Sequence, residues 1–168
     1  LWFIEPGSII TELPYLTVVW DLQHRLQPYF PEVSNDGQWF FREKNYSRFL
    51  RCASLILVGT DVGKNEVNIF YQIPMQRIKV LPLPTPSFAL TSYGEENDHE
   101  VMAKYDIEEG YLFYPAQFWP HKNHTNLLLA MHELVKVYHC DLKLVLVGSD
   151  KGNLDYIKKL VGELGLTD

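Results

Sequence analysis

Short apolar runs alternate along the chain with longer amphipathic stretches, and this pattern predicts alternating strands and helices. The apolar runs occupy 16–20, 54–59 and 77–81 in the first half and 111–116 and 142–147 in the second. Short, β-branched apolar runs are typical of buried parallel strands. Apolar residues at helical spacing predict helices at 38–52, 61–71, 123–138 and 155–164. The order of these elements predicts an α/β fold with parallel sheets.

The alternation breaks at the proline-rich segment 82–86, and polar, irregular sequence follows as far as 110. Each proline lacks the N–H that a strand would donate to its neighbour. Within 85–110 only a short helix at 100–105 is expected. The prediction is therefore an amino-terminal domain at 1–84, a linker at 85–110 and a second domain at 111–168, with separate cores.

Two residues are expected to mark helix ends. Thr60 fits an N-cap, because its hydroxyl can accept from a free amide of the first turn. Gly165 fits the left-handed position that follows the last helix. Each half holds too few strands for a complete doubly wound sheet, and the first residue is not Met, so the chain is expected to be a fragment.

Composition narrows the classes of function. The 168 residues include 15 Lys and Arg against 21 Asp and Glu, a net charge of −6 that argues against broad nucleic-acid binding. No apolar run approaches the roughly 20 residues that span a bilayer. The two cysteines lack metal or disulfide spacing, and a reducing cytosol is the expected location. A solvated helix face, or alternatively contact with an anionic membrane surface, explains the basic positions Arg42, Lys44, Arg48 and Arg51.

The segment 117–124 lies between a predicted strand and the helix after it. Ligands of open α/β sheets bind beyond the carboxyl ends of strands, and a helix N-terminus there favours phosphate. Lys122 adds a full positive charge, so a diphosphate fits this position. His121 and His124 have no carboxylate nearby, and no metal site is predicted. Gly148 permits either close approach of a ligand or a tight turn.

Other nucleotide signatures are missing from the sequence. It contains no GxGxxG, no GxxxxGK[ST] and no Asp-x-Asp. Polar residues also follow the first long strand, at Asp21, Gln23 and His24. For these three, catalysis, acceptor binding and hydrogen bonding within the loop all remain open.

Three segments of the chain resemble the family 4 (group 1) glycosyltransferases. They are YPAQFWPHKNH at 114–124 with LLLA at 127–130, WDLQH at 20–24, and RIKVLPLP at 77–84. The resemblance implies a GT-B fold, in which two Rossmann-like domains are joined by a linker and face a cleft. It also implies retaining transfer from a nucleotide sugar without a required metal.

The resemblance assigns roles to particular residues. Lys122 matches the lysine that contacts the donor diphosphate, and Gln117 stands where many members carry a partner arginine. The other matched donor-binding positions are Ala116, where many members have glycine, Asn123 and Gly148. Asp21 and His24 are the catalytic candidates, since Trp20 occupies the position that often holds a histidine. The family's Glu-x7-Glu segment is expected beyond Asp168.

The resulting prediction is a retaining enzyme that moves a hexose, with mannose as the leading candidate, from a nucleoside diphosphate to a glycan or lipid-linked acceptor. It needs no cofactor besides the donor substrate and binds no nucleic acid. It is expected in the cytoplasm, with peripheral contact at the cytoplasmic face of the membrane as an option. The alternative is a non-catalytic module of the same fold that binds nucleotide or glycan, which the departures at Gln117 and Trp20 favour.

Overall fold

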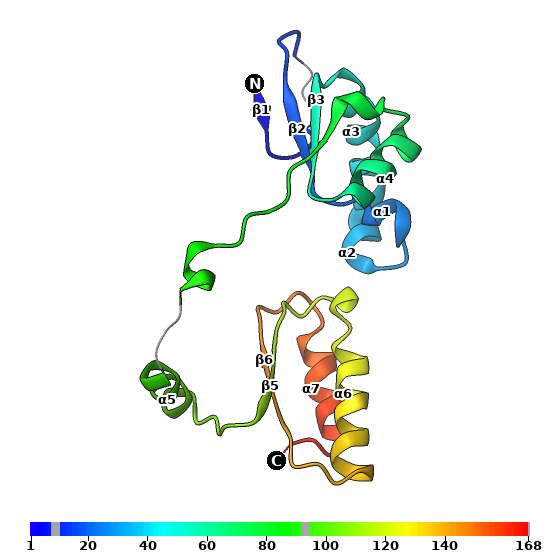
Figure 1. Ribbon diagram of the computed structural model, residues 1–168. Helices are drawn as coiled ribbons and strands as arrows, with labels where there is room; N and C mark the ends of the chain where they lie inside the picture. The colour runs from blue at the N-terminus through cyan, green and yellow to red at the C-terminus, as the bar shows by residue number, and fades with distance from the viewer. Residues whose placement is uncertain (8–10, 92–94, 168) are drawn as a thin grey trace. The chain divides into compact units, whose positions relative to one another are not determined.

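The computed structural model describes residues 1–7, 11–91 and 95–167 and divides the chain into two compact units, Leu1–Ser87 and Phe88–Asp168 (Figure 1). Each unit has its own parallel sheet and its own buried core. The boundary between the units falls inside the linker that the sequence predicts at 85–110. Residues 92–94 of that linker lie outside the described residues.

The linker region is more helical than the sequence analysis expects. Helix α5 (Glu95–Tyr105) has eleven residues, where only a short helix at 100–105 is predicted, and η3 (Ser87–Leu90) forms a 3-10 turn. The residues of this segment show weak helical spacing of apolar positions, so the sequence pattern does not locate the start of the helix.

Unit 1 contains a four-stranded parallel sheet whose strand order follows the chain, β1 (Trp2–Phe3), β2 (Leu16–Val19), β3 (Leu55–Val58) and β4 (Ile78–Val80). The helices are α1 (Gln23–Leu26), α2 (Pro31–Ser34), α3 (Gln38–Cys52) and α4 (Asp61–Tyr71), with 3-10 turns η1 (Asn35–Gly37) and η2 (Met75–Arg77). They lie on one side of the strands (Figure 1). Parallel crossovers of a single hand produce this arrangement when strands are added in sequence order.

The core of unit 1 lies between the helices and the face of the sheet that they cover. Alternate strand residues, such as Val19, Ile56 and Val58, are buried there against Phe49 and Leu50 of α3. Thr60 caps α4 as predicted, its hydroxyl accepting from the Gly63 amide at 3.0 Å. The strand β1 and the one-turn helices α1 and α2 are not predicted, because elements this short show no periodicity.

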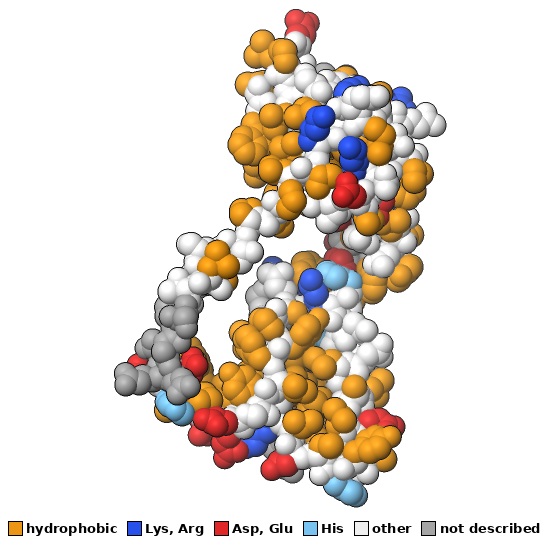
Figure 2. Space-filling view, in the orientation of Figure 1, with side chains coloured by type: hydrophobic (Ala, Val, Ile, Leu, Met, Phe, Trp, Pro, Cys, Tyr) orange, Lys and Arg blue, Asp and Glu red, His pale blue; other side chains and the backbone are white. Residues whose placement is uncertain are grey.

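The opposite face of the unit 1 sheet is apolar and exposed. Figure 2 shows hydrophobic side chains gathered beside β1 and β2. A groove of about 710 Å³ opens there, lined by Trp2, Val18, Trp20, Leu57, Val58, Gly59, Thr60 and 81–84. This groove has almost no polar lining, so it offers few hydrogen-bonding groups for a sugar or a phosphate.

Unit 2 pairs two parallel strands, β5 (Tyr111–Pro115) and β6 (Lys143–Val147), with α6 (His124–His132) and α7 (Leu154–Glu163) on one side (Figure 1). The predicted helix 123–138 begins at α6 and continues into a π-helical turn, η5 (Glu133–Val137), in which the Tyr138 amide donates to the Glu133 carbonyl. Gly165 takes the predicted left-handed position after α7, at φ +64°. Among the described residues, no helix is both long and apolar enough to cross a membrane.

Candidate functional site

The carboxyl ends of β5 and β6 meet at a backbone contact that only glycine permits. Pro115 pairs with Val147, so the next residues, Ala116 and Gly148, lie side by side. A Cβ atom on Gly148 would lie 2.1 Å from the carbonyl oxygen of Ala116, far inside contact distance. The Phe118 amide then donates to the Ser149 carbonyl at 3.0 Å. The two loops are thus joined just beyond the strands, where ligands of parallel sheets bind.

The Gln117 side chain is hydrogen-bonded to Trp119, two residues later. The Trp119 indole Nε1 donates to the Gln117 side-chain oxygen at 2.9 Å. This bond assigns the amide orientation and leaves the amide NH₂ of the exposed Gln117 to donate elsewhere. The ammonium of Lys151 lies 5.7 Å from the centre of the Trp119 ring, which places a second cation beside this loop.

Lys122 ends the 3-10 turn η4 (Pro120–Lys122), directly before α6. Asn123 takes a left-handed conformation at φ +57°, and no side chain caps the helix that starts after it. The Tyr114 hydroxyl donates to the Lys122 carbonyl at 2.8 Å and anchors the turn to β5. In the described part of the chain the Lys122 side chain is exposed and has no hydrogen bond or ion pair. An exposed lysine therefore lies two residues before the first residue of a helix that no side chain caps, which suits an anion.

The His124 side chain is buried in the interior of unit 2. Its ring is 1 % exposed and stacks on Phe118 with the ring centres 4.6 Å apart. Burial lowers the pKa of His124, and a backbone interaction with Ala116 only partly offsets this, so the ring is neutral at pH 7. His121, by contrast, is exposed. Across the described ranges no three His, Cys, Asp or Glu side chains gather.

Asp21 lies beyond the carboxyl end of β2 in unit 1. Its Oδ1 accepts from Arg42 at 2.8 Å and from the Gln23 amide at 3.0 Å. Burial alone would raise the pKa of Asp21, but the Gln23 amide and Arg42 together hold it below its ordinary value. The neighbouring Trp20 is turned aside, its indole donating to the Ile4 carbonyl at 2.8 Å. Asp21 is therefore ionised at pH 7. Arg42 was predicted to lie on an exposed basic helix face, which is wrong, because its side chain is half-buried and pairs with Asp21.

A cavity of about 190 Å³ adjoins Asp21 between the ends of β2 and β3 and the start of α4. Gln23, Thr60 and Glu66 supply its other polar lining. Burial raises the pKa of Glu66, and the charge of Asp21 adds to the effect. Two carboxyl groups with oppositely shifted pKa values thus share one small cavity, an arrangement that suits hydroxyl groups as ligands. Glu66 has no motif around it, and only the packing of α4 brings it to Asp21.

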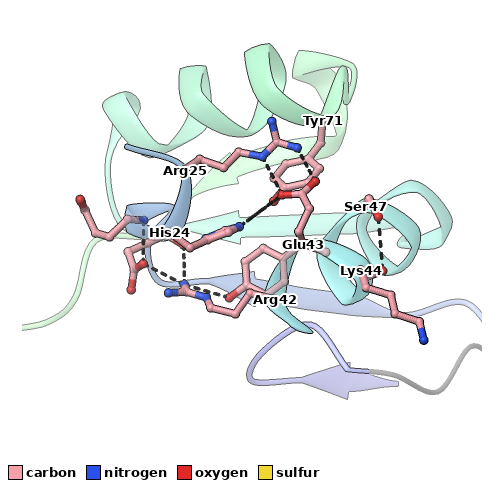
Figure 3. A network of polar contacts seen from close by, with 10 residues as sticks. His24, Arg25, Arg42, Glu43, Lys44, Ser47 and Tyr71 are labelled. Atoms are coloured by element: carbon pink, nitrogen blue, oxygen red, sulfur yellow. Dashed lines mark hydrogen bonds and ion pairs between the residues drawn. The ribbon is translucent and has the colours of Figure 1, made fainter. Parts of the chain in front are cut away.

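His24 is not placed where a catalytic residue would touch substrate. Its ring is 0 % exposed, with Nε2 3.2 Å from the Tyr71 hydroxyl and 3.5 Å from Glu43 Oε2 (Figure 3). Tyr71 in turn donates to Glu43 at 3.2 Å, and Arg25 forms a two-pronged ion pair with the same carboxylate. The structure thus argues against the predicted contact of His24 with substrate.

The charge state of His24 follows from the same surroundings. Burial, reinforced by the charge of Arg42, lowers its pKa to about 4 despite the opposing influence of Glu43. The ring is therefore neutral at pH 7. It joins α1 to α3 and α4 directly behind the loop that carries Asp21, which is the arrangement of a positioning residue. The sequence contains no pattern that links His24 to Glu43 or Tyr71.

The fold is shared with glycosyltransferases of known structure. A glycosyltransferase from Rickettsia africae superposes with a TM-score of 0.64 at 18% identity, over 94% of this chain and 39% of its own. Anabaena HepE, solved in complex with UDP-glucose, superposes with a TM-score of 0.65 at 18% identity, over 92% of this chain and 40% of its own.

These comparisons establish the fold and its extent. The chain spans about two fifths of the length of either glycosyltransferase. No protein-family model matches the sequence, and neither does any curated protein. The chain therefore has the parallel α/β fold seen in glycosyltransferase structures, as its sequence predicts.

Proposed function

We propose that the chain belongs to a retaining, metal-independent GT-B glycosyltransferase that moves a hexose, with mannose as the leading candidate, from a nucleoside diphosphate to a glycan or lipid-linked acceptor. The observation that carries the proposal is the loop pair joined at Gly148, with Lys122 and uncapped helix amides beside it. The shared fold supports it, since one of the structures with that fold holds UDP-glucose. The reaction is placed in the cytoplasm.

Donor binding in this proposal rests on unit 2. Lys122 and the first amides of α6 hold the diphosphate, while Gln117 donates its amide NH₂ to a phosphate oxygen. During transfer the bond between the anomeric carbon and the diphosphate oxygen breaks, and negative charge grows on the departing oxygen. The anomeric carbon bonds to the acceptor hydroxyl oxygen, and the proton of that hydroxyl passes to the departing diphosphate. A preorganised cation at this point stabilises the transition state more than the bound donor, which accelerates transfer. No prosthetic group enters this scheme.

Acceptor binding is assigned to unit 1. Asp21, ionised and held by Arg42, is oriented to accept a hydrogen bond from an acceptor hydroxyl. Glu66 lines the same cavity, and burial raises its pKa, so it is a second carboxyl group beside an acceptor hydroxyl. His24 keeps α1 in place behind Asp21, so its contribution is indirect.

The burial of His24 also favours a second candidate, a non-catalytic module that binds nucleotide or glycan. This chain has Trp20 at one predicted catalytic position and a buried histidine at the substitute position. Such a module would keep the donor loop and lose transfer. The two candidates differ in turnover and agree in donor binding.

The test compares Lys122→Ala with the unsubstituted protein, both in the complete protein of which this chain is a part, because the chain alone is expected to be incomplete and inactive. Lys158→Ala is the control, because Lys158 is also an exposed lysine. Donor affinity is measured by calorimetry with a panel of nucleoside-diphosphate sugars, and transfer is measured at steady state. A charge-assisted contact contributes about 1.5–3 kcal/mol to binding, or roughly 10- to 150-fold in Kd. Turnover should fall further, by about 100- to 1,000-fold.

Each outcome of this test has a distinct meaning. Lys122→Arg should recover only part of the loss, since the broader guanidinium places its charge differently. Donor binding without transfer in the complete, unsubstituted protein would support the binding module over the enzyme. Unchanged affinity and turnover in Lys122→Ala would show that the donor loop is misplaced.

A further inference from the structure

The outward side of α3 carries a pattern that neither the core nor the candidate site uses. At about 100° per residue, five residues of this helix fall within an arc of about 100°. They form what we name the outer face of α3, namely Phe40, Phe41, Lys44, Arg48 and Arg51. All five are exposed, Phe40 by 68% and Phe41 by 59% of their surface. The buried residues Tyr46, Phe49 and Leu50 lie on the other side of the helix.

The charge of the outer face is of one sign. The only acidic residue of α3, Glu43, lies off this arc and pairs with Arg25, while Arg42 turns inward to Asp21. Figure 3 shows the Lys44 side chain directed away from that network. Among the described residues, Lys44, Arg48 and Arg51 form no ion pair. Unit 1 as a whole is neutral, with eight Lys and Arg and eight Asp and Glu, so the outer face is a local excess of positive charge.

Arg77 adds to the cationic end of this helix. Its guanidinium donates to the carbonyls of Leu50, Arg51 and Ala53 at the C-terminus of α3. Cations are favoured at this end of a helix, where the backbone carries partial negative charge. These bonds satisfy carbonyls at the end of α3 and add a cation at the helix end that carries Arg48 and Arg51.

We propose that the outer face of α3 docks on an anionic lipid surface. From Phe40 to Arg51 the face runs straight for about 16 Å, which matches a planar partner. Lys and Arg at this spacing meet lipid phosphates, while the two phenylalanines at the helix start enter the boundary between headgroups and acyl chains. Charge complementarity identifies the partner as anionic, and the adjacent phenylalanines favour lipid over the polar groove of a nucleic acid.

This surface is independent of the donor loop. It lies in unit 1, whereas Lys122 and Gly148 lie in unit 2. It adds to the proposed function a reason for the enzyme to meet a lipid-linked acceptor at a membrane. Lys122→Ala should leave lipid binding unchanged. Failure of the lipid-docking proposal can therefore be distinguished from failure of the proposed donor site.

The experiment measures partitioning of the whole chain onto vesicles by sedimentation. Vesicles of equal parts phosphatidylglycerol and phosphatidylcholine are compared with vesicles of phosphatidylcholine alone, at low and physiological salt. The test variant replaces Lys44, Arg48 and Arg51 by Gln, which preserves helix propensity at exposed positions. The control replaces three exposed lysines elsewhere, Lys104, Lys136 and Lys158, and therefore removes the same charge.

The expected loss follows from the number of cations. Each Lys or Arg beside an anionic surface strengthens partitioning about fivefold, so the test variant should lose on the order of 100-fold and the control little. Phe40→Ser with Phe41→Ser should lose about tenfold, whereas Phe88→Ser with Leu90→Ser, also exposed, should not. Circular dichroism checks that every variant is folded.

Several results would overturn the proposal. These are equal binding to neutral and anionic vesicles, a test variant that binds as well as its control, and unchanged binding after loss of both phenylalanines. Tighter binding to a labelled oligonucleotide than to anionic vesicles would identify nucleic acid as the partner instead.

Discussion

Replacement of Gly148 by alanine tests the contact on which the donor loop depends. The added Cβ would lie 2.1 Å from the Ala116 oxygen, 2.6 Å from its carbonyl carbon and 2.8 Å from the Gln117 Cα. Ordinary contacts begin at 3.4 Å, so the backbones must separate by more than 1 Å. All three of these neighbouring atoms belong to the backbone, so no side chain can rotate to relieve the overlap. We therefore expect the loops after β5 and β6 to be forced apart.

The expected loss of stability in Gly148→Ala is the sum of two effects. Overpacking in a well-packed region costs about 1–3 kcal/mol, and the backbone overlap puts Gly148→Ala at the upper end. Separation of the loops also weakens the bond from the Phe118 amide to the Ser149 carbonyl, worth about 1 kcal/mol. The free energy of opening unit 2 should therefore fall by about 3 kcal/mol or more.

Hydrogen exchange measured by mass spectrometry resolves this effect by segment. Amides of β5 and β6 should exchange on the order of 100-fold faster in Gly148→Ala, while unit 1, with its own core, serves as an internal reference. Gly162→Ala is the matched control, because it lies inside α7 with nothing within 4 Å of the added Cβ. That control should gain up to about 1 kcal/mol from helix propensity.

Two outcomes would refute the reasoning. Unchanged exchange in β5 and β6 of Gly148→Ala would mean that the close approach of Ala116 to Gly148 is absent in solution. Intact donor affinity in a Gly148→Ala protein whose loops have separated would place the donor elsewhere.

The remaining predictions concern unit 1. The pKa of His24 is lowered from 6.5 to about 4, so between these values the unfolded chain binds a proton that the native state does not. The free energy of unfolding should therefore fall by about 3 kcal/mol between pH 7 and pH 4. In urea unfolding, His24→Gln should reduce this dependence on pH. An equal dependence on pH in the variant and the parent chain would contradict the buried, neutral ring. Thr60→Ala should cost about 1 kcal/mol through loss of the α4 cap, with Thr60→Ser nearly neutral, by the same assay. An equal loss in both variants would rule out the hydroxyl cap.

Much of the fold is readable from local sequence. The apolar runs locate β2 to β6, and helical spacing locates α3, α4, α6 and α7, because each pattern reports which face of an element is buried. Thr60 and Gly165 mark helix ends because their chemistry acts within one turn. Local signals of this kind also predict that Lys122 lies at the start of a helix that follows a strand.

Contacts between residues far apart in the sequence could be identified only from the tertiary structure. The contact between Ala116 and Gly148 depends on the register of two strands about thirty residues apart, and the sequence left a tight turn as an equal explanation of the glycine. Arg42 looked like part of a solvated basic face and instead turns to Asp21, because α3 packs directly behind that loop.

His24 shows most clearly where local reasoning stops. Its place after a strand and a polar loop suggested catalysis, since polar residues at strand ends often bind ligands. Burial among Glu43, Tyr71 and Tyr46 makes it an interior, neutral ring, and Glu66 instead reaches the cavity beside Asp21. The sequence by itself determines the order of elements and the local charge of the donor loop. Only the packing of helices on the sheet decides which polar side chains face solvent, because burial depends on residues distant in the chain.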